Sequence, residues 1–204
     1  MTVRSRRGEG DGVRLFDNPL LERLSDVHPA TVAVFWSGLS LALIAAGCAT
    51  RRISAVEFVE AVVSGFLGWT LFEYLAHRFL FHLGDWFAPA RRLSFIVHGC
   101  HHADPGDRTR NVMPIPAALP SFLAVFALFL LVLPLSSACV LFGVIGFSYL
   151  GYDLTHYACH QLPMTSRLGR YLKGRHMRHH FRDTTTNFAV TFPLWDCVFG
   201  TAAA

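Results

Sequence analysis

Charged side chains are scarce in this 204-residue chain, and their scarcity narrows the class of protein. Asp, Glu, Lys and Arg make up 16% of the residues, whereas 52% are apolar. Soluble domains carry about 25% charged residues, so this composition is typical of a protein in a bilayer. The first 28 residues contain five arginines but lack the apolar core that a secretory signal peptide requires. We therefore expect the first apolar run to stay as an anchor.

Sequence patterns for disulfide, phosphate and serine chemistry are also missing. The five cysteines form no C-x-x-C pair and no zinc-ribbon spacing, which argues against a disulfide framework. Cys100 and Cys159 lie between closely spaced histidines, but buried cysteine commonly behaves as a small apolar residue. No phosphate loop or catalytic serine motif occurs. The chemistry of the chain must therefore come from other residues.

Apolar runs predict four membrane spans in two hairpins. The spans are predicted at residues 31–49, 53–76, 115–133 and 137–155. Each is close to the roughly 20 residues needed to cross a hydrocarbon core of about 30 Å. The second run is the least regular, because Glu57, Glu60 and Glu73 interrupt it. We expect these acids near the two membrane interfaces, since an acid inside the bilayer is costly and otherwise suggests function.

The basic residues predict the orientation of these spans. Two hairpins put the N-terminal segment 1–28, the loop 77–113 and the C-terminal segment on one side. Of the 18 Lys and Arg residues, all except Arg51 and Arg52 lie on that side. The positive-inside rule then makes it cytoplasmic, for both termini and for any site there. Anionic lipid headgroups explain the dispersed basic residues more simply than a nucleic-acid surface does, so we expect no nucleic-acid partner.

Histidine is abundant where other polar residues are few. Ten of the eleven histidines fall in four groups, all on the predicted cytoplasmic side. The groups are His77 and His82; His98, His101 and His102; His156 and His160; and His176, His179 and His180. Residues at i, i+3 and i+4 share one helix face, so each H-x-x-H-H group can offer two or three imidazoles to one point. The first pair lies about 140° apart on a regular helix, so either that helix unwinds or its two histidines serve different ions.

Ten imidazoles exceed the needs of one metal ion, so the sequence predicts two. Imidazole binds zinc, iron, copper and nickel, and the ligand type alone does not choose between them. A catalytic zinc would indicate hydrolysis or carbonyl polarisation, whereas paired iron would indicate activation of dioxygen. The lack of a clear carboxylate contribution to the clusters distinguishes this pattern from the Glu-rich di-iron bundles.

The ordered histidine groups and their neighbours resemble the fatty acid hydroxylase and sterol desaturase superfamily, and within it the fatty acid 2-hydroxylases. The stretches that carry the resemblance are FEYLAHRFLFH, HGCHHADPGDRTRNVMP, GYDLTHYACH, YLKGRHMRHHF and LWDCVFGT. They extend over nearly the whole chain from about residue 15. The resemblance implies an all-α integral membrane protein, with residues 29–204 forming four transmembrane helices and a cytoplasmic histidine-rich helical cap that holds a di-metal site.

The resemblance also implies an activity and a set of site residues. The activity is O2-dependent hydroxylation at C2, the carbon next to the carboxyl or amide carbon, of a long acyl chain. All ten clustered histidines become ligands of two transition-metal ions, with iron in the active enzyme and zinc as an adventitious occupant of a purified sample. Asp153 and Tyr157 flank the third cluster, where Asp153 either orients an imidazole or is a solvated acid. Asn187, Trp195 and Asp196 are expected to pack the cap.

The implied partners are a fatty acid or acyl-lipid substrate, the bilayer and a separate electron donor. Relatives commonly carry a fused haem domain, for which this chain has no room before the first span, and His28 lacks the glycines of a haem-binding turn. Basic residues near the cap could hold a polar head; they are Arg78, Arg108, Arg110, Lys173 and Arg175.

Two alternatives stay open at this point. One is another activity of the superfamily, such as sterol methyl oxidation, carotenoid hydroxylation or acyl desaturation. The other is a non-catalytic membrane protein that binds or transports metal, which would need ligands along its spans rather than at one face.

Overall fold

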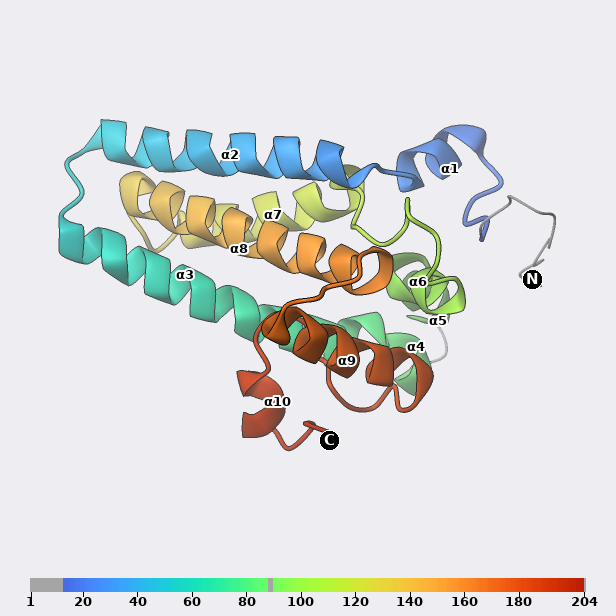
Figure 1. Cartoon of the computed structure of the whole chain (residues 1–204). Helices are drawn as coiled ribbons and strands as arrows, with labels where there is room; N and C mark the ends of the chain where they lie inside the picture. Colours follow the sequence, from blue (N-terminus) through green and yellow to red (C-terminus); the bar gives the residue numbers. More distant parts are fainter. Residues whose placement is uncertain (1–12, 88–89, 204) are drawn as a thin grey trace.

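The computed structural model describes residues 13–87 and 90–203, and within these ranges it contains helices and no strand (Figure 1). The four longest apolar helices are α2 (Pro29–Thr50), α3 (Ala55–Leu75), α7 (Ile115–Phe129) and α8 (Leu135–Gln161). The remaining segments, in which η denotes a π-helix, are α1 (Pro19–Ser25), η1 (Ala76–Phe81), α4 (Leu83–Trp86), α5 (Arg91–Ser94), η3 (Phe95–Gly99), α6 (Cys100–Ala103), α9 (Arg167–Phe181) and α10 (Leu194–Val198). The predicted all-α class is confirmed for the described residues.

Three helical stretches are long and apolar enough to cross a membrane: Pro29–Thr50, Ala55–Phe81 and Leu135–Gln161. They correspond to the predicted spans 31–49, 53–76 and 137–155. The fourth, α7, is apolar but has only 15 residues, a length of about 22 Å at 1.5 Å per residue. It ends at Phe129 rather than at the predicted residue 133. The number of membrane crossings therefore stays a prediction.

Small residues let α2 and α8 approach closely along the bundle. A Cβ atom built on Gly143 would lie 2.7 Å from the backbone oxygen of Ser40, and one on Gly47 would lie 2.6 Å from that of Ser136. Such contacts allow only glycine, the usual means of close helix packing in membranes. Next to them, the buried ring of Trp36 on α2 meets the ring of Tyr149 on α8, with 4.7 Å between centroids.

The turns at the far end of the bundle are tied together by polar contacts. Ser54 and Glu57 form a capping box at the start of α3, and Arg51 bonds both Glu57 and Ser136. Pro134 precedes α8 in the turn that follows α7, where the sequence predicts a turn. Figure 1 shows these turns at the end of the bundle opposite α4, α5, α6 and α9, so these four helices gather at one end.

The N-terminal helix α1 is attached to the end of the bundle that carries α4, α5, α6 and α9 (Figure 1). Asn18 caps α1, and Glu22 accepts a hydrogen bond from Arg110 at 2.6 Å. His28, the unclustered histidine, caps α2 by accepting a bond from the backbone N–H of Ala30. Arg4, Arg6 and Arg7, which contribute to the predicted orientation, lie outside the described residues.

Candidate metal centre

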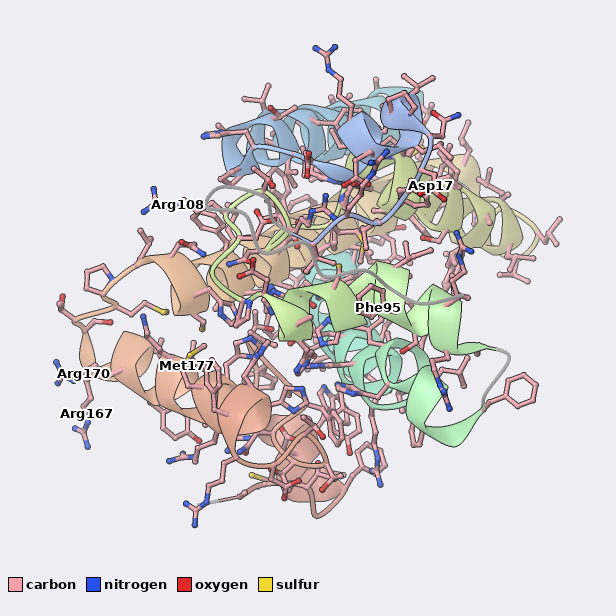
Figure 2. The ribbon with its side chains drawn as sticks, turned by 90° about the vertical axis from the view of Figure 1, so that its right-hand side faces the viewer. Asp17, Phe95, Arg108, Arg167, Arg170 and Met177 are labelled. Carbon is pink, nitrogen blue, oxygen red and sulfur yellow. The ribbon has the colours of Figure 1, made fainter. Side chains whose placement is uncertain are left out.

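The ten clustered histidines come together as two groups of five. Within each group the potential ligand nitrogens all lie within 4.8 Å of one another. The first group consists of His77, His82, His98, His102 and His179, and the second consists of His101, His156, His160, His176 and His180. Figure 2 looks at this end of the molecule, with Met177 of α9 on one side and Phe95 of η3 on the other. The sequence predicts this clustering, and either group could hold one metal ion.

A change of helix type brings His77 and His82 into the same group. The chain leaves the α-helical geometry of α3 and continues as the π-helix η1. A π-helical hydrogen bond joins residues five apart, so residues with this spacing lie on nearly the same face. The Nε2 atom of His77 lies 3.1 Å from that of His98, and the Nε2 atom of His82 lies 3.2 Å from that of His179. Of the two sequence interpretations, the altered helix is therefore the one that the structure favours.

The second group is built largely on regular helices. His156 and His160 are one turn apart on α8, and His176 and His180 are one turn apart on α9. The Nε2 atoms of His160 and His176 are 2.8 Å apart. His101 of α6 completes the group, with its Nε2 atom 3.0 Å from that of His180. The i, i+4 spacing therefore brings both imidazoles of each pair into the same group, as the sequence predicts.

Each H-x-x-H-H motif divides its histidines between the two groups. The first and third histidines of a motif, at i and i+4, enter one group, and the middle one enters the other. His101 and His179 are these middle residues. Each motif therefore offers two imidazoles to one point and not three, whereas the sequence leaves both numbers open. The groups are adjacent, since the rings of His102 and His180 stack with 4.0 Å between centroids.

Carbonyl oxygens fix the orientation of two imidazoles in each group. In the first, the Nδ1 atoms of His77 and His179 bond the backbone oxygens of Phe188 and Thr186, at 2.5 and 2.8 Å. A carbonyl oxygen only accepts, so each Nδ1 carries the hydrogen and each Nε2 presents a lone pair. This hydrogen bond on the distal ring nitrogen is the usual arrangement of a metal-binding histidine.

In the second group, Asn111 alone fixes the orientation of two imidazoles. Its backbone oxygen accepts from Nδ1 of His156 at 2.9 Å, and its side-chain oxygen accepts from Nδ1 of His101 at 3.2 Å. The amide nitrogen of Asn111 donates to the backbone oxygen of Pro105, which fixes the orientation of the amide. Two lone pairs therefore point into this group as well.

The electrostatics of the site favour neutral imidazoles. Burial, helped by neighbouring imidazoles, lowers the pKa of His102 to about 2. Burial also lowers the pKa of His179 to about 4, despite the bond to Thr186. The Nε2 atom of His156 is buried and has no hydrogen-bond partner in the described part of the chain. Neutral, convergent nitrogen lone pairs fit a transition-metal ion in each group.

Asp153 supports the site through a backbone amide and a tyrosine hydroxyl and not through an imidazole. Its carboxylate accepts from the backbone N–H of Met113 at 3.1 Å and from the Tyr149 hydroxyl at 3.3 Å. In the described chain these bonds replace the expected contact with an imidazole, and Asp153 is buried rather than solvated. It holds the segment that carries Asn111. Tyr157 is half-buried and packs on the neighbouring apolar core.

The C-terminal residues Asn187, Trp195 and Asp196 pack around the first group. Asn187 has a φ of 57° and its side chain accepts from the backbone N–H of Ala203. The indole N–H of Trp195 donates to the Thr70 hydroxyl. Asp196 is fully buried and accepts from two backbone N–H groups of the adjacent segment. These contacts agree with the expected packing role.

Sequence reasoning missed the roles of Asn111 and Glu73. Asn111 carries no pattern that connects it with His101, ten residues earlier, or with His156, 45 residues later. Glu73 does carry a signal, because an acid in an apolar run suggests function. It lies away from water, 3% exposed, and bonds the backbone of residues 190 and 191.

Two of the basic residues expected to hold a substrate head are occupied elsewhere. Arg110 forms ion pairs with Glu22 and Asp26, and Arg175 is buried against Asp196 at 2.8 Å. The expectation is wrong for these two arginines, because partners inside the protein already neutralise them. Cys100 donates to the backbone oxygen of Ile96, and no cysteine belongs to either histidine group in the described chain.

The fold and the site together define an all-helical protein with membrane-type helices and paired histidine clusters suited to metal ions. A family model described as fatty acid hydroxylase matches residues 62–201. The chain belongs to the fatty acid hydroxylase family, which confirms the resemblance seen in its motifs.

Curated relatives and a solved structure agree with this family. Dihydroceramide fatty acyl 2-hydroxylase FAH1 of Arabidopsis thaliana is 34% identical over 94% of this chain and 80% of its own length. Fatty acid 2-hydroxylase of Rattus norvegicus is 36% identical over 93% of this chain, which spans 56% of that protein. A structure of full-length scs7p, with only the hydroxylase domain visible, superposes with a TM-score of 0.87 at 32% identity, covering 96% of this chain and 74% of that one.

Proposed function

We propose that this chain is a membrane-bound hydroxylase that uses O2 to place a hydroxyl group on C2 of a long acyl chain. The observation that carries the proposal is the pair of adjacent five-histidine groups, in a chain whose relatives are named fatty acid and fatty acyl 2-hydroxylases. Transport of metal is less well supported, because the histidines gather at one end of the bundle instead of along the helices.

The ten histidines would hold two transition-metal ions, which we propose are iron in the active enzyme. When bound, redox-active ions would supply the activation of O2 that side chains alone do not provide. Zinc has no redox chemistry, so zinc-loaded protein should be inactive. The protein's own contribution is to keep the imidazoles neutral, to direct Nε2 atoms into each group and to exclude water from them.

An apolar groove supports an acyl chain as substrate. The groove has a volume of about 590 Å³ and lies mainly between α3 and α8. All of its lining residues are uncharged; they are Ile44, Phe58, Val62, Phe66, Trp69, Thr70, Val144, Phe147, Ser148, Gly151, Tyr152, Thr155 and Thr191. Tyr152 and Thr155 place part of this lining beside the second histidine group, because the Tyr152 ring stacks on His156 with 6.0 Å between centroids.

The uncharged lining favours an amide-linked acyl chain over a free carboxylate. Burying an unpaired carboxylate is costly, whereas a neutral amide needs only hydrogen bonds. Of the five basic residues considered for the polar head, Arg110 and Arg175 are neutralised inside the protein, and none of the five lines the groove. We therefore propose a ceramide-like lipid as the preferred substrate. Purified, iron-loaded enzyme should hydroxylate an N-acyl lipid faster than the corresponding free acid, and the reverse order would contradict this preference.

The reaction consumes one O2, two electrons and two protons for each C–H bond that becomes C–OH, with water as the second product. We propose that a separate protein donates the electrons and that the histidine end of the bundle faces the cytoplasm. Cysteines introduced at Thr109 and Thr184, both exposed, should be labelled from the same side as the N-terminus. Labelling of either from the opposite side would overturn this orientation.

Lipid analysis tests the activity itself. The gene is expressed with a competent electron donor in a host that lacks acyl 2-hydroxylation, and the lipids are compared by mass spectrometry with those of cells carrying a His156→Ala, His179→Ala double variant. We expect 2-hydroxy acyl chains only with the wild-type chain. Mid-chain unsaturation or an oxidised sterol would instead assign the protein one of the other activities of its superfamily.

A further inference from the structure

Four consecutive backbone N–H groups near the first histidine group are all held by carboxylates. Asp196 accepts from the N–H groups of Phe188 and Ala189, each at 2.9 Å. Glu73 accepts from those of Val190 and Thr191, at 2.7 and 3.0 Å. The segment 188–191 is therefore fixed at every amide by one of two acids.

The two acids come from distant parts of the chain and are both buried. Glu73 lies on α3 and is 3% exposed, and Asp196 lies on α10 and is 0% exposed. Asp196 is also paired with Arg175 at 2.8 Å. Besides the two amides, Glu73 accepts from the hydroxyl of Thr191, which belongs to the same segment. Because a buried carboxylate is costly unless it is fully hydrogen-bonded, two of them on four amides indicate that this segment must be placed accurately.

The segment carries or adjoins the two carbonyl groups that orient histidines of the first group. Phe188, whose N–H is held by Asp196, directs its oxygen to Nδ1 of His77. Thr186, two residues earlier, directs its oxygen to Nδ1 of His179. A shift of the segment would therefore move both acceptors away from two imidazoles at once.

We propose that Glu73 and Asp196 are positioning residues for the first histidine group, acting through segment 188–191. The inference rests on the proposed binding of one metal ion by that group. The second group depends on a different support, since Asn111 holds His101 and His156, and Asp153 holds the amide of Met113, two residues after Asn111. Loss of the Glu73 contacts should therefore weaken one ion and leave the other in place.

Metal retention by a Glu73→Gln variant tests this inference. The substitution removes the charge that strengthens the bonds to the amides of Val190 and Thr191, and it places an N–H₂ group against the Thr191 hydroxyl in place of an acceptor oxygen. Asp196→Asn would in addition leave Arg175 unpaired. Wild-type and variant enzyme, loaded with iron or cobalt in detergent, are challenged with a chelator, and release is followed by elemental analysis and by the cobalt absorption spectrum. We expect one of the two ions to leave about tenfold faster, at the low end of the effect of changes around metal ligands. Glu60→Gln, an exposed acid on the same helix, is the matched control and should release both ions as wild type does.

Two further variants keep the test decisive. Thr191→Val removes only the hydroxyl that donates to Glu73, and it should accelerate release of the same ion even if Glu73→Gln does not fold. In a His77→Ala background, which lacks that ion, Glu73→Gln should cause no further change in the remaining one, since both changes act on one site. Equal acceleration of both ions, or unchanged release in both Glu73→Gln and Thr191→Val, would overturn the inference. Wild-type protein that binds no metal would instead refute the proposed metal centre on which it rests.

Discussion

The two histidine groups contain the same number of imidazoles but are built differently. Four members of the second group occupy one-turn pairs on the regular helices α8 and α9. The first group takes His77 from the π-helix η1, His82 from the residue directly after that helix, and His98 from the π-helix η3. It also relies on the C-terminal segment for its carbonyl acceptors. A regular helix thus supplies ligands by spacing alone, whereas the other group requires altered helices and a distant support.

The strongest test of this comparison removes one ligand from each group. We expect His156→Ala to lose the ion of the second group and His179→Ala to lose that of the first, each with activity falling to background. The loss should exceed the effect of about 10–100-fold typical of changes beside a metal ligand. Elemental analysis and turnover of an acyl lipid measure both effects. If either variant kept two ions per chain, the division into two groups would be wrong.

Acid should destabilise the metal-free protein through both groups alike. In the first group, burial lowers the pKa of His102 to about 2 and that of His179 to about 4, from a usual 6.5, and in the second group burial lowers the pKa of His101 and His180. Between pH 6.5 and these values the unfolded chain binds more protons than the folded chain, so the free energy of unfolding falls as the pH falls. Each such histidine contributes about 1.4 kcal/mol per pH unit. Thermal unfolding of metal-free protein in detergent should show a lower Tm at pH 5 than at pH 7.5, and a constant Tm would contradict the buried neutral imidazoles.

A smaller effect should follow from Asn111→Ala, which removes one acceptor from the second group. His101 loses the side-chain oxygen that fixes its ring, while His156 keeps the backbone oxygen. We expect the affinity for one ion to fall about 10-fold, or about 1.4 kcal/mol. Gln161→Ala is the control, because Gln161 also bonds the Pro105 oxygen but no imidazole in the described chain. Competition with a chelator measures both variants, and equal losses would show that the imidazole contact is unimportant.

The smallest effect is expected for Cys100→Ala. Cys100 lies directly before His101 and His102, but its sulfur donates to Ile96 and joins neither group. Removing a small buried side chain should cost about 1 kcal/mol of stability and leave both ions bound. Loss of an ion would contradict the all-histidine description of the two groups.

The sequence predicts the regular half of the site better than the irregular half. The i, i+4 pairs on α8 and α9 follow directly from helix geometry. The length of their apolar runs predicts the helices α2 and α8, which carry Trp36 and Tyr149. The division of each H-x-x-H-H motif between two groups depends on what packs on either side of the helix, which spacing alone does not contain. The π-helix at His77 is likewise not encoded by a local pattern that we can identify, and the sequence leaves it as one of two alternatives.

Side-chain partners are the part of the site that sequence reasoning predicts least. The sequence places Asp153 close to His156 and His160, yet its carboxylate binds the backbone N–H of Met113 instead of an imidazole. Arg110 and Arg175 have the right charge for a polar head but are neutralised by acids on other elements of the fold, Glu22 on α1 and Asp196 on α10. Such pairings depend on tertiary contacts. The unusual cost of an acid in an apolar run marks Glu73 in advance, and the family resemblance marks Asp153 and Asp196.

Isotope labelling of the product tests the central claim most directly, because it asks both where the oxygen is placed and where it comes from. Iron-loaded enzyme is supplied with an electron donor and an N-acyl lipid under ¹⁸O2 in ordinary water, and the acyl chain is analysed by fragmentation mass spectrometry. We predict one ¹⁸O atom in a hydroxyl group on C2. A hydroxyl group whose oxygen comes from water, or an oxygen from O2 at any other carbon, would contradict the assignment of this chain as an O2-dependent acyl 2-hydroxylase.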